Sequence, residues 1–165
     1  MDLIDNAMNN EAIIYPAKFE PSNCSVFVHN EILINASPEE IWLCLVNATT
    51  WHEWYSNASK IQILNYHNKY LLADSKFKWR TFGINLESEI VEFIPHQRLA
   101  WKAVGMGTFA YHAWLIIPTE NGCKVITEET QYGWLCRLGK FLMPNLIYKY
   151  NQIWLNGLKD KSEKE

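Results

Sequence analysis

Apolar and polar residues alternate through the middle of the chain, a pattern typical of β-strands. In residues 76–81 the rings of Phe77 and Trp79 fall on one side and charged residues on the other. The alternation resumes in residues 84–90 after a turn at residues 82–83, which predicts an antiparallel pair. Similar strand patterns occur in residues 25–34, 61–63, 99–104, 109–117 and 123–131.

Charged residues around the turn at residues 82–83 predict the register of this pair. A turn centred there places Lys78 opposite Glu87 and Lys76 opposite Glu89 on the outer face. Opposite charges favour this alignment, because like charges directly across two strands are destabilising. The inner face of the pair would then carry Phe77, Trp79, Leu86, Ser88 and Ile90.

The last two strands join through a turn at residues 119–122. Either plausible register across it places His112 and Trp114 on the same face as Glu129 and Gln131. We expect this face to point inward, so a histidine and a carboxylate would share the interior of the protein.

Helix signals flank the strand-rich region. Ser37 can cap a helix that begins at Pro38, and Glu40 completes a capping box. A second short helix or turn is expected at residues 50–55. Together these signals predict two short helices after the first strand.

A helical period begins at Trp134 and continues to the charged end of the chain. Pro144 is expected to kink or interrupt this helix, because proline removes a backbone donor and clashes with the preceding turn. The predicted apolar stripe consists of Leu135, Leu138, Leu142, Leu146, Tyr150, Ile153 and Gly157.

Four segments give the sequence a resemblance to the START-like (SRPBCC) superfamily, whose fold is called helix-grip or birch-pollen-allergen-like. They are ASPEEIW (36–42), TWHEWYSNA (50–58), EFIPHQRLAW (92–101) and AWLIIPTENGCKVITEETQYG (113–133). The sequence looks most like the polyketide cyclase/dehydrase and lipid-transport group. The motifs mark helix starts and turns, so they are specific for the fold and less informative about function.

The resemblance implies an α+β protein of the helix-grip class. We expect a curved antiparallel sheet of about seven strands, two short helices and one long C-terminal helix. Residues 1–22 would form an N-terminal arm, residues 23–160 a single START-like domain and residues 161–165 a charged tail.

Such a fold implies an apolar cavity between the sheet and the C-terminal helix. A hydrophobic or amphipathic small molecule, lipid or polyketide-like, would be its ligand. Polar side chains predicted to point inward, and therefore to contact a ligand, are Asn30, Ser88 and Gln131. Apolar ligand contacts are predicted at Phe77, Trp79, Trp101, Trp114, Leu138, Leu142 and Leu146. The alternative is that these rings and leucines simply fill a solid core.

His112 and Glu129 are the candidate catalytic residues. Histidine would transfer a proton while the carboxylate orients it, as cyclisation or dehydration of a carbonyl compound requires. The alternative is a hydrogen-bonded polar pair near the cavity rim. Three functions therefore stay open: a ligand-binding protein, a cyclase or dehydratase, and a protein-interaction module with a vestigial cavity.

Composition and motifs reduce the range of possible binding partners and cofactors further. The 165 residues carry a formal net charge of −3, which gives no basic surplus for binding nucleic acid. The four cysteines form no CxxC pair, and the Gly105-Met106-Gly107 segment lacks the GxGxxG pattern, so neither a metal nor a cofactor is implied. No signal-peptide pattern is visible at the start, which predicts a cytoplasmic protein. Membrane contact through the first part of the C-terminal helix is the weaker alternative to burial of that helix on the sheet.

Overall fold

The computed structural model describes residues 11–164 as seven strands, four α-helices and three short 3-10 turns. The strands are β1 (Val26–Ile34), β2 (Ser59–Ile63), β3 (Lys76–Thr81), β4 (Ile84–Ile94), β5 (Arg98–Gly105), β6 (Thr108–Thr119) and β7 (Gly122–Tyr132). The α-helices are α2 (Pro38–Val46), α3 (Trp51–Trp54), α4 (Trp134–Leu142) and α5 (Leu146–Ser162). The 3-10 turns are η1 (Ala17–Phe19), η2 (Pro21–Asn23) and η3 (Ala48–Thr50).

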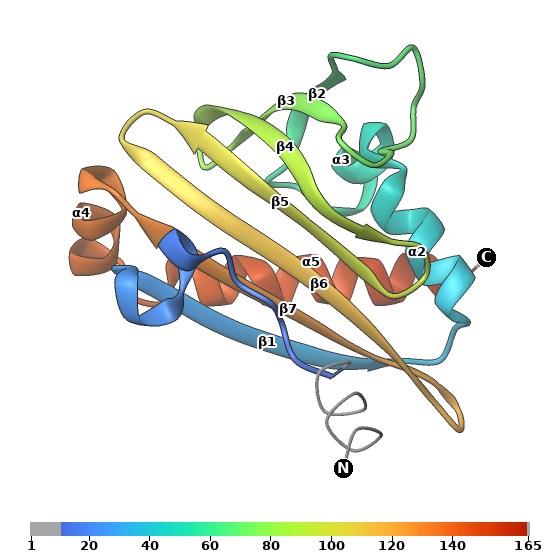
Figure 1. The fold of residues 1–165 in the computed structure, drawn as a ribbon. Helices are drawn as coiled ribbons and strands as arrows, with labels where there is room; N and C mark the ends of the chain where they lie inside the picture. The colour runs from blue at the N-terminus through green and yellow to red at the C-terminus, as the bar shows by residue number, and fades with distance from the viewer. Residues whose placement is uncertain (1–10, 165) are drawn as a thin grey trace.

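All seven strands belong to one antiparallel, curved sheet with the order β1-β7-β6-β5-β4-β3-β2. Helix α5 crosses one face of this sheet, and α2 and α3 lie beside the half of α5 that is nearer the C-terminus (Figure 1). The architecture confirms the predicted α+β fold with helices on one face of an antiparallel sheet.

The strand registers agree with those predicted from the charge pattern. Lys78 pairs with Glu87 and Lys76 with Glu89, and their charged atoms lie 3.0 and 3.8 Å apart. Both pairs are exposed, so each contributes only about 0.2–1 kcal/mol, and their main effect is on register. In the β6–β7 pair, His112 lies directly opposite Glu129, as the turn geometry predicts.

Helix α2 begins with the predicted capping box. The Ser37 hydroxyl accepts a hydrogen bond from the Glu40 backbone N–H, and the Glu40 carboxylate accepts one from the Ser37 N–H at 2.7 Å. Pro38 occupies the first turn, where its missing N–H leaves no partner unsatisfied. The sequence of this cap therefore fixes where the chain turns from β1 into the helical layer.

The C-terminal helix is interrupted at Pro144, so it consists of α4 and α5 rather than one continuous rod. Met143 leaves the helical conformation, with φ −141° and ψ 71°, because the proline that follows disfavours the α region at the preceding residue. Helix α4 therefore projects at the end of the sheet, while α5 lies across it (Figure 1).

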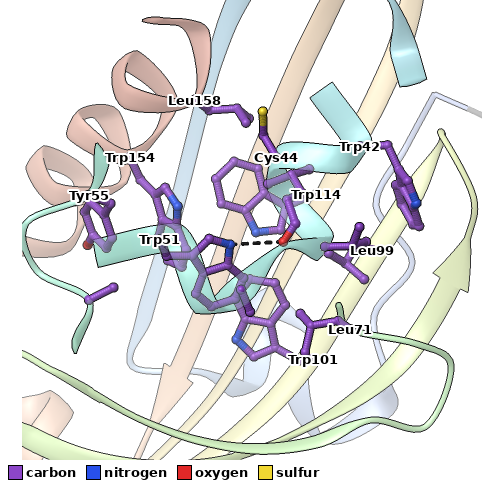
Figure 2. Close-up of a cluster of buried hydrophobic side chains, with 14 of the residues drawn as sticks. Trp42, Cys44, Trp51, Tyr55, Leu71, Leu99, Trp101, Trp114, Trp154 and Leu158 are labelled. Atoms are coloured by element: carbon purple, nitrogen blue, oxygen red, sulfur yellow. Dashed lines mark hydrogen bonds between the residues drawn. The ribbon is translucent and has the colours of Figure 1, made fainter. Parts of the chain in front are cut away.

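Aromatic side chains fill the interior between the sheet and α5. The indole of Trp51 stacks on Trp101 at 5.5 Å between ring centroids and meets Trp154 edge-on at 5.2 Å. Its Nε1 donates a hydrogen bond to the Leu45 carbonyl at 3.0 Å, so the buried N–H is satisfied (Figure 2). On its other side Trp154 stacks on Tyr55 at 4.4 Å.

Residues that precede β1 cover part of the opposite face of the sheet. The rings of Tyr15 and Phe19 each lie 5.8 Å from Tyr111 of β6. The Tyr111 hydroxyl donates to the Ile14 carbonyl at 2.9 Å, and the Arg98 guanidinium donates to the Ala12 carbonyl at 2.6 Å. This segment gives the outer face a small apolar cluster of its own.

Two helical glycines provide a test of how closely α5 packs on α3. A Cβ atom at Gly157 would lie 2.4 Å from the Trp54 carbonyl oxygen, whereas one at Gly139 in α4 would meet no atom within 4 Å. We expect Gly157→Ala to destabilise the protein by about 1–3 kcal/mol through overpacking. Gly139→Ala should stabilise it by up to about 1 kcal/mol through helix propensity.

Urea unfolding measures both glycine variants in the same conditions. Equal stabilities for the two variants would contradict the close approach of α5 to the end of α3.

Candidate functional site

A pocket of about 540 Å³ lies between the sheet and helices α4 and α5. Its walls are mostly apolar and come from strands β1 and β3–β7, with α4, α5 and the residues around the Pro144 break on the other side. The sheet side is lined by Val26, Phe27, Val28, Trp79, Thr81, Phe82, Ile84, Leu86, Trp101, Ala103, Met106, Thr108, Ala110, His112, Glu129 and Gln131. The remaining lining residues are Tyr55, Leu135, Cys136, Gly139, Lys140, Met143, Pro144, Leu146, Ile147, Asn151 and Trp154.

One buried polar cluster interrupts the apolar walls, and Glu129 is at its centre. The Gln131 side-chain amide donates to Glu129 Oε1 at 2.6 Å, and the Asn151 amide donates to Oε2 at 3.1 Å. His112 Nδ1 lies 3.6 Å from the same Oε2. Two donors therefore hold the carboxylate in place between β7 and α5, because each of its oxygens accepts one amide hydrogen bond.

The hydrogen bonds around His112 determine which of its ring nitrogens carries the proton. Nε2 lies 2.8 Å from Thr127 Oγ1, and the Thr127 hydroxyl donates its own hydrogen to the Ala113 carbonyl at 3.0 Å. Since a hydroxyl has a single hydrogen, Nε2–H must be the donor to Thr127. In the neutral ring Nδ1 is therefore a free acceptor that faces Glu129.

Burial keeps the imidazole in this neutral form. The side chain is almost completely inaccessible, and the resulting desolvation lowers the pKa of His112, against the opposing attraction of Glu129. The pocket thus presents an unprotonated ring nitrogen and a carboxylate oxygen side by side. Such a pair can accept a hydrogen bond or a proton from a bound molecule.

Six of the residues singled out from the sequence line this pocket together. They are Trp79, Trp101, His112, Glu129, Gln131 and Leu146. All except Leu146 come from strands, where the alternation of side chains decides directly which face each residue occupies.

Four other singled-out residues are buried but lie outside the lining. Phe77 and Trp114 belong to the aromatic core. Ser88 accepts a hydrogen bond from Trp79 Nε1 at 3.0 Å. Asn30 donates to the Tyr148 carbonyl and to Gln152 Oε1, so it connects β1 to α5. The Ser88 hydroxyl and the Asn30 amide nitrogen are thus paired within the protein, whereas Asn30 Oδ1 and Trp114 Nε1 are buried without a hydrogen-bond partner.

Leu138 and Leu142 differ most from expectation, because both are exposed and outside the pocket lining. They were expected to share one continuous stripe with α5. The break at Pro144 allows α4 a different rotation, and α4 directs Leu135, Cys136 and Gly139 to the pocket instead.

The stripe predicted for α5 was also displaced by one residue. The buried face carries Asn151, Trp154, Leu155, Leu158 and Ser162, and so includes Asn151 of the polar cluster, which the sequence reasoning missed. The available signal was the 3-4 spacing of Asn151, Leu155 and Leu158, with Trp154 beside them.

Neither a metal centre nor a membrane span is found in the part of the chain that the structure describes. Among residues 11–164, no three His, Cys, Asp or Glu side chains gather closely enough to hold a metal ion. No helix in the same range is long and apolar enough to cross a membrane.

The chain belongs to the family described as polyketide cyclase/dehydrase and lipid transport, whose sequence model matches residues 25–163. No curated protein matches the sequence significantly. The fold is similar to that of a hypothetical protein, jhp0584, from Helicobacter pylori, with 30% identity and a TM-score of 0.85; the match covers 92% of this chain and 96% of that one.

More distant structures have the same fold. A START superfamily protein from Mycobacterium smegmatis is 12% identical, with a TM-score of 0.70 and coverage of 84% and 97%. The ZhuI aromatase/cyclase from Streptomyces sp. R1128 is 9% identical, with a TM-score of 0.72 and coverage of 84% and 94%. The recognition of a START-like, helix-grip protein from its sequence motifs is thereby confirmed.

The neutral state of His112 predicts a pH dependence of stability. Its pKa is lowered on folding, so below its ordinary value of about 6.5 the unfolded chain binds the proton more readily than the folded protein. The contribution of His112 to the free energy of unfolding should therefore fall as the pH is lowered from 7 toward 5. The slope cannot exceed about 1.4 kcal/mol per pH unit, because one proton is involved.

The measurement compares urea unfolding of the wild type and of His112→Gln at each pH. The difference between the two proteins removes the contribution of His29, whose pKa is raised by its hydrogen bond to Glu128 and which acts in the opposite direction. A difference that does not change with pH would contradict a neutral, buried His112.

Proposed function

We propose that this protein binds an amphipathic small molecule, lipid or polyketide-like, inside the pocket. The observation that carries the proposal is a mostly apolar pocket with a buried polar cluster centred on Glu129. The volume of about 540 Å³ is within the range of about 300–1,000 Å³ typical of small-molecule sites. Membership in a family associated with lipid transport supports the same function.

The polar cluster indicates the type of ligand group that it would receive. Glu129 and the free Nδ1 of His112 are both acceptors, so a hydroxyl that donates a hydrogen bond suits them. A ligand carboxylate would place a second negative charge beside Glu129, which is unfavourable in a buried site. Apolar carbon would lie along the walls, where each buried methylene contributes about 0.8 kcal/mol.

Two adjacent residues of β5 offer a matched test of this site. Ala103 is buried and lines the pocket, whereas Val104 points to the other face and is exposed. We expect Ala103→Phe to lower the affinity for 1-decanol at least about tenfold, because the added ring occupies the ligand's space. Val104→Phe, which adds a ring of the same kind outside the pocket, should leave the affinity unchanged.

Tryptophan fluorescence can follow the titration, because Trp79, Trp101 and Trp154 all line the pocket. Thermal unfolding of both variants checks that the fold is retained. Equal affinities of the two folded variants would place the binding site elsewhere, and a wild type that binds no apolar ligand would end the proposal.

A second candidate is an enzyme of the cyclase or dehydratase type, which the position of His112 specifically favours. Its Nδ1 is unprotonated and faces the pocket beside Glu129, as a general base requires. The description of the family as polyketide cyclase/dehydrase makes poly-β-ketone compounds the substrates to try. The base would remove a proton next to a carbonyl and return it to the leaving hydroxyl.

For this second candidate we expect His112→Gln to abolish turnover of a poly-β-ketone while it preserves binding. Glutamine keeps a side-chain N–H for Thr127 and removes the ring nitrogen that would take the proton. Product formation and ligand affinity are measured on the same preparation. Turnover at the wild-type rate would exclude His112 from any catalytic role.

A further inference from the structure

Helix α4 exposes the apolar side that a helix of a globular protein normally buries. Trp134, Leu138, Phe141 and Leu142 are all exposed, and the exposed fractions reach 63% for Trp134 and 83% for Phe141. Their spacing of four, three and one residues places them along one side of the helix. We call these four residues the α4 stripe. A contiguous apolar surface of this kind marks an interaction site.

The charged residues of α4 itself, Arg137 and Lys140, are both positive. Between residues 130 and 149 the chain carries these two and Lys149 and no aspartate or glutamate, although the whole protein has a formal net charge of −3. Arg137 and Lys140 flank the stripe on α4 itself and donate hydrogen bonds to Ser25 at 3.2 and 2.7 Å. Their cationic groups are therefore held beside the apolar side chains.

The same helix also forms part of the pocket wall. While the α4 stripe faces solvent, Leu135, Cys136 and Gly139 line the pocket from the other side of α4. At its start, Trp134 lies so close to Gly107 that a Cβ there would overlap the indole. The neighbouring Met106 is 63% exposed and lines the pocket, so the stripe adjoins a point where the pocket meets solvent.

Tryptophan, phenylalanine and leucine on one side of a helix, with lysine and arginine beside them, are the features of helices that lie in a membrane interface. A protein partner would need an acidic surface whose shape is complementary to four separate side chains. An anionic bilayer offers negative charge and an apolar layer that does not need a complementary shape. We infer that α4 docks on the surface of a bilayer that contains anionic lipid, with the α4 stripe inserted at the level of the headgroups. This docking brings the pocket against the membrane, and it does not depend on which ligand the pocket holds.

Vesicle co-sedimentation of the full chain tests the docking. We expect binding to vesicles of phosphatidylcholine with 30% phosphatidylserine, and several-fold weaker binding to phosphatidylcholine alone, because the positive flank attracts anionic lipid. The double variant Leu138→Ser/Phe141→Ser should reduce partitioning at least about tenfold, since it removes two inserting side chains. Leu33→Ser, at an exposed leucine of β1, is the control and should partition like the wild type.

Two further measurements separate docking from ligand binding and from self-association. The double variant should keep the wild-type affinity for 1-decanol, because neither residue lines the pocket. Size-exclusion chromatography should show no change of oligomeric state on mutation. Absence of vesicle binding by the wild type, or a dimer that the double variant dissociates, would overturn the inference, and loss of decanol binding in all proteins would instead count against the proposed pocket function.

Discussion

The packing of indole rings between the sheet and α5 is the interaction on which the rest of the structure depends. Trp51 comes from the helical layer, Trp101 from the sheet and Trp154 from α5, and their centroids lie 5.2–6.0 Å apart. Rings of this size cannot be compressed or rotated freely, so they set the separation between α5 and the strands (Figure 2). Trp101 and Trp154 also line the pocket, so the pocket begins at the edge of this ring packing. The hollow beneath α4 follows from this arrangement.

The polar cluster is connected to the same support. Asn151 precedes Trp154 by one helical turn, so the ring that fixes α5 also fixes the amide that donates to Glu129. His112 stacks on Trp114 and meets Trp154 edge-on, so its plane is set by aromatic contacts before any ligand arrives. A site built on strands and on a rigid helix in this way keeps its geometry better than one built on loops.

The sequence allowed the strand part of the site to be predicted well, and the helical part poorly. Along β6 and β7 successive side chains point to opposite faces of the sheet. Either plausible register of the turn at residues 119–122 puts His112, Glu129 and Gln131 on one face, so no tertiary information is needed. On a helix an error of one residue rotates the stripe by about 100°. That is how Asn151 was missed and how Leu138 and Leu142 were expected inside. Pro144 was correctly expected to interrupt the helix, but the rotation of α4, which precedes the break, depends on contacts with Gly107 and Ser25, which are distant in sequence.

The interruption at Pro144 also separates two structural roles, packing in the core and lining the pocket beside α4, that one continuous helix would have to combine. Helix α5 packs in the hydrophobic core, whereas α4 is a short helix that forms part of the pocket wall and is joined to α5 by residues 143–145. Because the backbone ladder of α5 does not run through this junction, the orientation of α4 is set by its own contacts, which include hydrogen bonds to Ser25 and to the Gly107 carbonyl. The shape of the pocket on this side therefore depends on the contacts that α4 makes with Ser25 and Gly107, which are separate from the aromatic interior.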